Sequence, residues 1–442
     1  MWRSVFQHKG ARISAGLLGF YAGSEVYLYF QTQSLIKARQ HVSAAMANPD
    51  DIDITKFKSA TVAGMFVNPF EEYRPQTGFE FMCVRVLELV ESFYGNRIEL
   101  HEHLPNHQTT EDYLKVHKPD LEIFRKNSQI IHQCATTNNY SQLYKKTRRW
   151  FSSARLPPLS NQLLFTWLGQ SCSLIQISGI NILTDPILSD YLIMPHVGPK
   201  RLNKSPMTFE DIQFATNNKL DFIMVSHDHP DHLENDLIAK FGNSSTWIVP
   251  VGLRKSLARK GVFNVIEMDW WDSVSLNEYM DGNLKDIYEV VCVPSMHWSG
   301  RYIVDANFSL WCSYILRKNG KSILYHAGDT GYSKQLFDII GKKYGPISFS
   351  LLPIGQYCPS WHQKPRHISP EECIQICQQT HSKYMMGVHW GTFKLSSEPI
   401  LEPKNLLTKL SSQLHKLEYY RTPEFGLTYL FDIEHDVEYK LH

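Results

Sequence analysis

Four potential metal ligands in the spacing HxHxDH lie within the six consecutive residues His227-Asp228-His229-Pro230-Asp231-His232; they are His227, His229, Asp231 and His232. The apolar run at 222–225 comes just before them and predicts a buried strand, so these ligands are expected where a strand ends and a loop begins. Imidazole nitrogens and a carboxylate oxygen are suitable ligands for zinc or a similar divalent cation. The spacing therefore predicts a metal site, and a solvated loop is the alternative.

Three more candidate ligands follow short apolar runs in the same way. They are His297 after residues 290–294, Asp329 after 322–325 and His389 after 384–388. A loop-forming pair that contains glycine comes shortly after each of them. One such residue alone could be a core histidine or a turn aspartate, but the repeated strand-end position favours convergence on one edge of a sheet.

The order of these ligands resembles that of the metallo-β-lactamase superfamily, which implies an α/β fold, a four-layer αβ/βα sandwich with a two-metal site at one edge. Within the superfamily, the chain more closely resembles the family of N-acyl-phosphatidylethanolamine-hydrolysing phospholipases D. Most of residues 160–432 take part in this resemblance. The motifs that carry it include Phe66-Val67-Asn68-Pro69-Phe70, Thr166-Trp167-Leu168-Gly169, Leu183-Thr184-Asp185-Pro186-Ile187, Gly198-Pro199-Lys200-Arg201, Ala327-Gly328-Asp329-Thr330-Gly331-Tyr332 and His389-Trp390-Gly391-Thr392-Phe393.

The resemblance implies two Zn²⁺ ions per chain. The implied ligands are His227, His229 and His297 for one ion, and Asp231, His232 and His389 for the other. Asp329 would bridge the two ions and take part in catalysis. Gly328 and Gly331 flank it and would let the backbone turn tightly near the ions.

Three other residues are candidates for roles around the ions. The resemblance implies that His367 is catalytic, contacting the substrate head group or assisting departure of the leaving group; the alternative is a histidine just before the helix start at 369–372. Asp185 is expected to orient a ligand histidine by accepting its other N–H, with a turn aspartate as the alternative. Arg366 would favour a phosphate or carboxylate through bidentate pairing.

One apolar loop is expected to face a membrane, or else to pack against the N-terminal extension. Its residues are Tyr191, Leu192, Ile193 and Met194. Lys200 and Arg201 follow and are expected to meet lipid phosphates. Three positions depart from the family pattern: Gln170 stands where histidine is usual, Pro230 where tyrosine is common, and Arg366 where a neutral amide is frequent. These changes leave the ligand set intact and the head-group and acyl selectivity open.

The composition suits a large catalytic domain with an extension. The 442 residues leave room for a domain of about 270 residues. The 45 basic and 44 acidic residues nearly cancel, so bulk charge gives no reason to expect a nucleic-acid partner. The eight cysteines form no CxxC motif, which favours a reducing compartment.

The predicted organisation is residues 1–40 as a presequence-like and hydrophobic anchor segment, 41–158 as an N-terminal extension, and 159–442 as the catalytic domain. Residues 1–12 contain Arg3, Lys9 and Arg12 and no acid, as in mitochondrial presequences. Residues 13–30 are near the lower length limit for crossing a bilayer, and Glu25 within them is costly. We expect an anchor in the mitochondrial inner membrane; a peripheral helix on another intracellular membrane is the alternative, and a homodimer is possible.

The expected elements alternate in the manner of an α/β protein. Strands are predicted at 163–168, 173–184, 221–226, 246–250, 288–294, 309–317, 321–326, 348–353 and 384–389. Helices are predicted at 35–46, 79–94, 208–216, 233–240, 252–260, 332–343, 370–380 and 403–412. Residues 95–140 are polar, and no regular element is predicted there.

These inferences predict a zinc-dependent phospholipase D-type enzyme that cleaves N-acyl-phosphatidylethanolamine to phosphatidic acid and an N-acylethanolamine. Its partners would be a phospholipid substrate and a membrane surface. The alternatives are another two-metal hydrolase (a lactonase, thioesterase or nuclease) and a non-catalytic membrane-bound scaffold with the same fold. The lactam-hydrolysing branch of the superfamily often uses a cysteine near the second metal. No cysteine here stands at a strand end beside these ligands, so the resemblance disfavours hydrolysis of a β-lactam.

Overall fold

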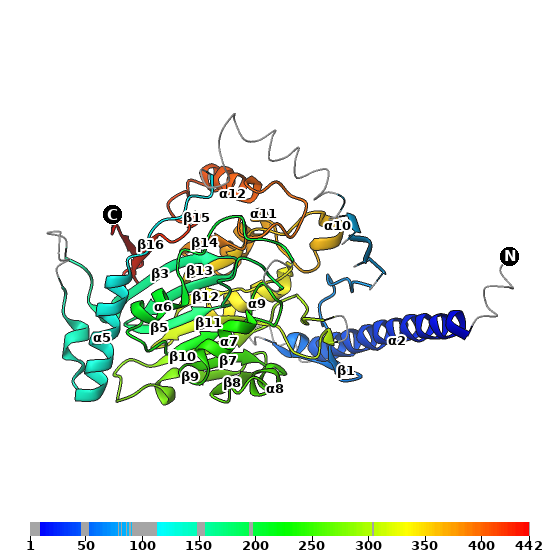
Figure 1. Cartoon of the computed structure of the whole chain (residues 1–442), viewed down its shortest axis with the longest axis horizontal. Helices are drawn as coiled ribbons and strands as arrows, with labels where there is room; N and C mark the ends of the chain where they lie inside the picture. The colour runs from blue at the N-terminus through cyan, green and yellow to red at the C-terminus, as the bar shows by residue number, and fades with distance from the viewer. Residues whose placement is uncertain are drawn as a thin grey trace.

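The computed structural model describes residues 9–45, 53–77, 113–147, 155–193, 198–302 and 305–441, together with parts of 79–90. Two β-sheets pack face to face in this part of the chain, with helices on their outer faces (Figure 1). The ring of Phe165 lies 5.3 Å from that of Phe349, which joins the two sheets across the core. The predicted four-layer αβ/βα sandwich is confirmed.

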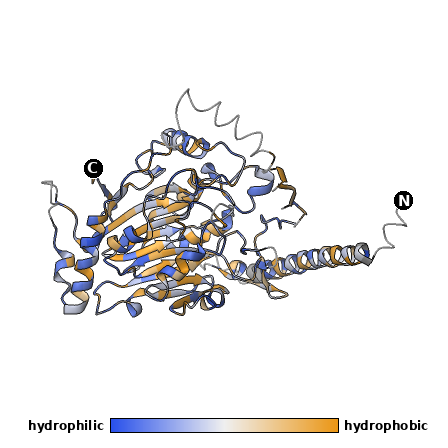
Figure 2. Ribbon diagram, in the orientation of Figure 1, coloured by the Kyte–Doolittle hydropathy of each residue, from blue (hydrophilic) through white to orange (hydrophobic). Residues whose placement is uncertain are grey.

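Each sheet contains a parallel and an antiparallel part. The first sheet consists, in spatial order, of β15 (Tyr420–Arg421), β14 (Tyr384–Val388), β13 (Ile347–Pro353), β12 (Lys321–His326), β11 (Ser313–Lys318), β10 (Tyr288–Val293) and β9 (Ser273–Ser275). The second consists of β17 (Val437–Tyr439), β16 (Thr428–Asp432), β3 (Gln162–Gly169), β4 (Cys172–Ile177), β5 (Ile180–Thr184), β6 (Phe222–Met224), β7 (Thr246–Pro250) and β8 (Val265–Met268). Figure 2 shows apolar residues concentrated in these strands.

Strand direction determines where the strand-end residues meet. β12, β13, β14 and β15 pair in parallel. β10 and β12 are both antiparallel to β11, so β10 runs in the same direction as β12. The carboxyl ends of β10, β12 and β14 therefore lie at one edge of the sandwich, which is the usual place for a site in an open α/β sheet.

The helices cover the outer faces of the two sheets. On the first sheet these are α9 (Lys334–Tyr344), α11 (Pro370–Gln379) and α12 (Glu402–Gln413), and on the second they are α6 (Phe209–Ala215), α7 (Asn235–Phe241) and α8 (Leu253–Ala258). A short helix, α10 (Ser360–Gln363), lies between β13 and α11 in the chain. A capping box begins α11, where the Ser369 hydroxyl accepts from the Glu372 N–H and the Glu372 carboxylate accepts from the Ser369 N–H. The helices predicted in this region are confirmed within about two residues.

Two predictions about elements were wrong. The strand expected at 173–184 is a hairpin of β4 and β5, because Ser178 and Gly179 turn the chain with positive φ angles of 54° and 95°. The Ser178-Gly179 pair is a turn signal in the sequence that the prediction passed over. Residues 95–140 include a helix, α5 (Leu121–Thr137), which begins at Asp120 and buries Phe124, Ile131 and Cys134. The short strands β8, β9, β15, β16 and β17 were not predicted.

The N-terminal extension contributes small elements that lie against the sandwich. They are η1 (Thr55–Phe57), β1 (Thr61–Val62), β2 (Met65–Phe66) and η2 (Tyr140–Tyr144). Two more short helices, η3 (Leu159–Asn161) and η4 (Leu276–Tyr279), belong to the sandwich sequence. Phe57 stacks on Phe70 at 5.3 Å. The Asn68 side-chain amide donates to the His297 carbonyl at 2.7 Å, so the extension reaches the candidate ligands directly.

Residues Lys9–Ala45 form one long helix, α2, so the helix predicted at 35–46 is the carboxyl end of a longer one. Its amino-terminal half projects from the sandwich (Figure 1) and exposes large apolar side chains such as Leu17, Leu18 and Phe20. Near its carboxyl end, Ile36 is buried and Arg39 donates to the Ser59 carbonyl. Among the described residues, no helix combines the length and apolar character needed to cross a membrane. Residues 1–8 of the presequence-like stretch lie outside the described residues.

The contact between α9 and α11 gives a test of this packing. A Cβ atom at Gly341 would clash with the backbone oxygen of Gln379, so Gly341→Ala should lower the free energy of unfolding by about 2 kcal/mol. Gly19→Ala in α2 is the matched control, because no atom lies within 4 Å of its added Cβ. Urea denaturation measures both variants. Equal stability of Gly341→Ala and the wild type would contradict the described packing.

Candidate metal centre

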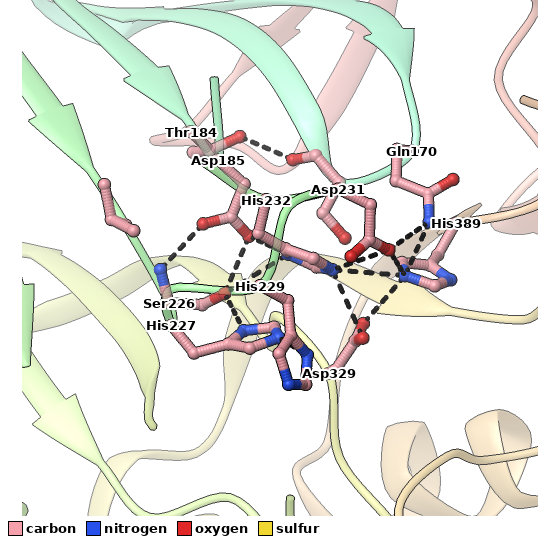
Figure 3. A network of polar contacts seen from close by, with 12 residues as sticks. Gln170, Thr184, Asp185, Ser226, His227, His229, Asp231, His232, Asp329 and His389 are labelled. Carbon is pink, nitrogen blue, oxygen red and sulfur yellow. Dashed lines mark hydrogen bonds and ion pairs between the residues drawn. The ribbon is translucent and has the colours of Figure 1, made fainter. Parts of the chain in front are cut away.

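The seven predicted ligands come together at the carboxyl edge of the sandwich, and all are buried. The loop after β6 supplies four of them, and the loops after β10, β12 and β14 supply one each. They form two groups whose ligand atoms lie within 4.8 Å of one another: His227, His229 and His297 in one, and Asp231, His232, Asp329 and His389 in the other. Figure 3 shows six of these side chains directed toward a common centre.

The first group consists of three imidazoles. His229 Nδ1 lies 2.7 Å from His227 Nε2 and 3.3 Å from His297 Nε2. A tetrahedral zinc site, with Zn–N bonds of about 2.0–2.1 Å, holds its ligand nitrogens about 3.3 Å apart. Burial lowers the pKa of His229 and of His297 to about 3, and that of His227 well below its ordinary value. The imidazoles are therefore neutral, which is the form that binds a cation.

The second group combines two imidazoles with two carboxylates. His232 Nε2 lies 3.2 Å from His389 Nε2 and 3.2 Å from Asp329 Oδ2. Asp231 Oδ2 lies 3.5 Å from His389 Nε2. Burial opposes ionisation of Asp329, but the charges of His232 and His389 outweigh it and hold the pKa of Asp329 well below its ordinary value.

Asp329 lies between the two groups. Its Oδ1 is 3.1 Å from His389 Nε2, and its Oδ2 is 3.7 Å from His297 Nε2. One carboxylate thus faces ligand atoms of both groups. The donor set of five imidazoles and two carboxylates, with their nitrogens and oxygens facing inward, fits divalent cations of the zinc type.

Asp185 fixes the orientation of a candidate ligand. Its Oδ2 accepts from His232 Nδ1 at 2.9 Å and from His326 Nε2 at 3.0 Å, and its Oδ1 accepts from the Ser226 N–H at 2.7 Å (Figure 3). Burial opposes ionisation, but His326 and His232 outweigh it and lower the pKa of Asp185 to about 2. The carboxylate therefore directs His232 Nε2 toward the centre.

His367 also lies in the centre. Its Nδ1 is 3.9 Å from Asp329 Oδ2, and its ring is 5.1 Å from that of His297. Burial lowers the pKa of His367 well below its ordinary value, so the imidazole is neutral. The residue also stands just before the capped start of α11, as the alternative described it. Its catalytic role stays a prediction.

Two arginines that were predicted to contact substrate instead donate hydrogen bonds to backbone carbonyls of the protein. Arg366 is buried, and its guanidinium donates to the carbonyls of His362 and Arg74. Arg201 is 5% exposed and donates to the carbonyls of Leu168 and Ile187. The expected phosphate contacts of both residues are wrong in this structure, because a basic residue near a motif does not reveal whether backbone carbonyls already occupy its donors.

The predicted membrane-facing loop lies on the surface. Ile193 is 60% exposed, Lys200 is exposed, and Tyr191 and Leu192 are half-buried. Tyr191 and Lys200 form an antiparallel bridge that holds the two arms of the loop together. Met194 lies outside the described residues.

Three residues at the centre were not predicted as site residues. Gln170 contacts two candidate ligands, His326 contacts Asp185, and Asn68 contacts the backbone of His297. One indication for Gln170 was present in the sequence, because it stands where the family usually has histidine. His326 stands at the end of β12, three residues before Asp329, in a strand-end position like those of the ligands.

Comparisons with known proteins give the family. Residues 180–390 match the Beta-lactamase superfamily domain. The chain is 37% identical over 429 residues to the mitochondrial N-acyl-phosphatidylethanolamine-hydrolyzing phospholipase D of Saccharomyces cerevisiae, covering 93% of this chain and 86% of that protein. The chain belongs to the family of N-acyl-phosphatidylethanolamine-hydrolyzing phospholipases D.

One further sequence relative and one solved structure are similar to part of this chain. N-acyl-phosphatidylethanolamine-hydrolyzing phospholipase D 1 of Caenorhabditis elegans is 34% identical over 259 residues, covering 56% of this chain and 69% of that protein. A solved metallo hydrolase of the archaeon Ignicoccus hospitalis is 24% identical with a TM-score of 0.46, covering 61% of this chain and 98% of that one.

The contacts of Asp185 predict how metal affinity changes when one of its carboxylate oxygens is replaced by an amide nitrogen. In Asp185→Asn, an amide nitrogen would replace one acceptor facing His232, His326 and Ser226, so we expect metal affinity to fall about 10- to 100-fold. Mass spectrometry of bound metal, after dialysis against a graded chelator, measures this change.

Asp221→Asn is the matched control, because Asp221 is another buried carboxylate paired with a histidine, His132, at 3.2 Å and away from the centre. It should lower stability and leave metal affinity unchanged. Full retention of metal by Asp185→Asn would rule out the orienting role.

Proposed function

We propose that this chain is a zinc-dependent phospholipase D-type hydrolase that converts N-acyl-phosphatidylethanolamine and water to phosphatidic acid and an N-acylethanolamine. The observation that carries the proposal is the position of Asp329 between two ligand groups, its oxygens 3.1 Å from His389 Nε2 and 3.7 Å from His297 Nε2. The name of the yeast relative, which matches most of both chains, supports the substrate.

Two Zn²⁺ ions are the cofactors we propose. His227, His229 and His297 would hold one, Asp231, His232 and His389 the other, and Asp329 both. When bound, such a pair would lower the pKa of a water molecule and polarise the phosphoryl oxygens of a phosphodiester. The absence of cysteine from both groups suits zinc held by nitrogen and oxygen ligands.

The remaining chemistry belongs to side chains of the protein. Hydrolysis forms a bond between the water oxygen and phosphorus and breaks the bond from phosphorus to the N-acylethanolamine oxygen. That leaving oxygen needs a proton. A neutral His367 carries one N–H and lies 3.9 Å from Asp329, so it is placed to donate a hydrogen bond to a leaving oxygen or to a phosphoryl oxygen. The attacking water releases the proton that the leaving oxygen takes up. Asp185 would keep His232 in the tautomer that faces the ions.

Access to a lipid is the other requirement. The exposed side chain of Ile193 and the nearby charge of Lys200 are suited to the boundary between acyl chains and lipid phosphates. The projecting half of α2 offers further apolar surface for a membrane. We propose a mitochondrial membrane, supported by the basic, acid-free residues 1–12 and by the name of the yeast relative.

The central test removes one ligand at a time. Asp329→Asn and His227→Ala should each abolish release of phosphatidic acid from N-acyl-phosphatidylethanolamine while the circular dichroism spectrum stays unchanged. Asp338→Asn and His435→Ala are matched controls, because these residues lie in ion pairs away from the centre, and both should retain activity. Activity in either ligand variant would contradict the metal mechanism. Thioester and RNA substrates assayed in parallel identify a different two-metal hydrolase.

Location is tested with the first 40 residues. Fused to a fluorescent reporter, they should direct it to mitochondria, and changing Arg3, Lys9 and Arg12 together to glutamine should abolish this targeting, because presequences depend on positive charge. Fluorescence microscopy with a mitochondrial dye makes the measurement. A diffuse cytosolic signal from the unchanged segment would reject the mitochondrial assignment.

A further inference from the structure

The turn between β3 and β4 enters the metal centre although it carries none of the candidate ligands. Gln170 lies in this turn with a positive φ of 51° and is only 1% exposed. Its backbone N–H donates to Thr392 Oγ1 at 2.7 Å, and its carbonyl accepts from the His389 N–H at 3.0 Å. These two bonds tie the turn to the loop that carries His389.

The side chain of Gln170 contacts two ligand atoms of the second group. Its Nε2 lies 2.8 Å from Asp231 Oδ2 and 2.9 Å from His389 Nε2 (Figure 3). An ionised carboxylate only accepts hydrogen bonds, so the contact with Asp231 requires that the amide nitrogen, not the oxygen, face the centre. One amide thus holds together side chains from the loops after β6 and β14.

We infer that Gln170 is a positioning residue that sets the affinity of the second ligand group for its ion. The inference rests on the proposed metal binding. A carboxylate oxygen that binds a cation still has a lone pair for a hydrogen bond, so Gln170 can keep its bond to Asp231 when His389 Nε2 turns its lone pair to an ion. The amide is neutral, so it orients Asp231 without adding charge to the centre.

The contacts predict a selective effect. No hydrogen bond joins Gln170 to the first group in the part of the chain that the structure describes. Loss of the amide should therefore weaken metal binding by the second group alone. A purely structural role for Gln170 would instead lower stability and affect both groups together.

Gln170→Met tests this selectivity, because methionine has a similar length and volume and no donor. Metal-free protein is titrated with Zn²⁺ against a chromogenic chelator, which gives two dissociation constants. We expect the weaker binding of the second group to show as a rise of about 10- to 100-fold in its Kd, with the first Kd unchanged. Gln170→His places a ring nitrogen the same number of bonds from Cα and should recover most of the affinity.

Gln176→Met is the matched control. Gln176 lies in the neighbouring strand β4, is also 1% exposed, and donates through Nε2 to the Phe124 carbonyl and to Asn181 Oδ1 at 2.8 Å. The same substitution there should lower the melting temperature and leave both dissociation constants unchanged. If Gln170→Met fails to fold, Gln170→Asn replaces it, because asparagine tolerates a positive φ and its shorter side chain withdraws the amide from Asp231.

Three outcomes overturn the inference. They are unchanged dissociation constants in the Gln170 variant tested, equal weakening of both groups, and no recovery with Gln170→His. The wild-type protein reports separately on the proposed function. If it binds fewer than two ions, the two-metal proposal and this inference both fail, whereas two ions in the wild type and no selective loss in the variants reject only the role of Gln170.

Discussion

The structure depends on the burial of seven imidazole and carboxylate ligands in one small volume. Removing such groups from water costs free energy unless they pair with one another or with a cation. The three imidazoles of the first group are neutral because burial lowers their pKa values. The Nδ1 atom of His229 lies 2.7 Å from His227 Nε2 and 3.3 Å from His297 Nε2. Each neutral imidazole can direct the lone pair of one ring nitrogen inward, and a divalent cation among the three nitrogens would accept all of these lone pairs.

The rest of the fold positions these groups. Parallel strand directions bring the ends of β10, β12 and β14 to the edge where the loop after β6 also emerges. Asp185, from the end of β5, joins His232 to His326, and Gln170, from the β3–β4 turn, joins Asp231 to His389. Asn68 adds a contact from the N-terminal extension to the backbone of His297. The centre therefore draws on segments far apart in the chain, and the extension is part of it.

Much of this could be predicted from the sequence, because the ligands follow apolar runs and strand ends can be recognised locally. Asp329 and His389 were found by that pattern alone. The burial of Arg201 and Arg366 could not be predicted, since it depends on backbone carbonyls supplied by distant segments. The roles of Gln170 and His326 depend on which side chains face them across the sandwich. The β4–β5 hairpin was missed although Ser178-Gly179 marks the turn, because β-prone residues continue on both sides of that pair.

Anomalous X-ray diffraction at the zinc edge, from crystals of the purified full chain, tests the central claim most directly. The account predicts two peaks, one among His227, His229 and His297 and the other among Asp231, His232 and His389, with Asp329 between them. A single peak, peaks at other residues, or no anomalous signal from protein purified with zinc present would contradict it.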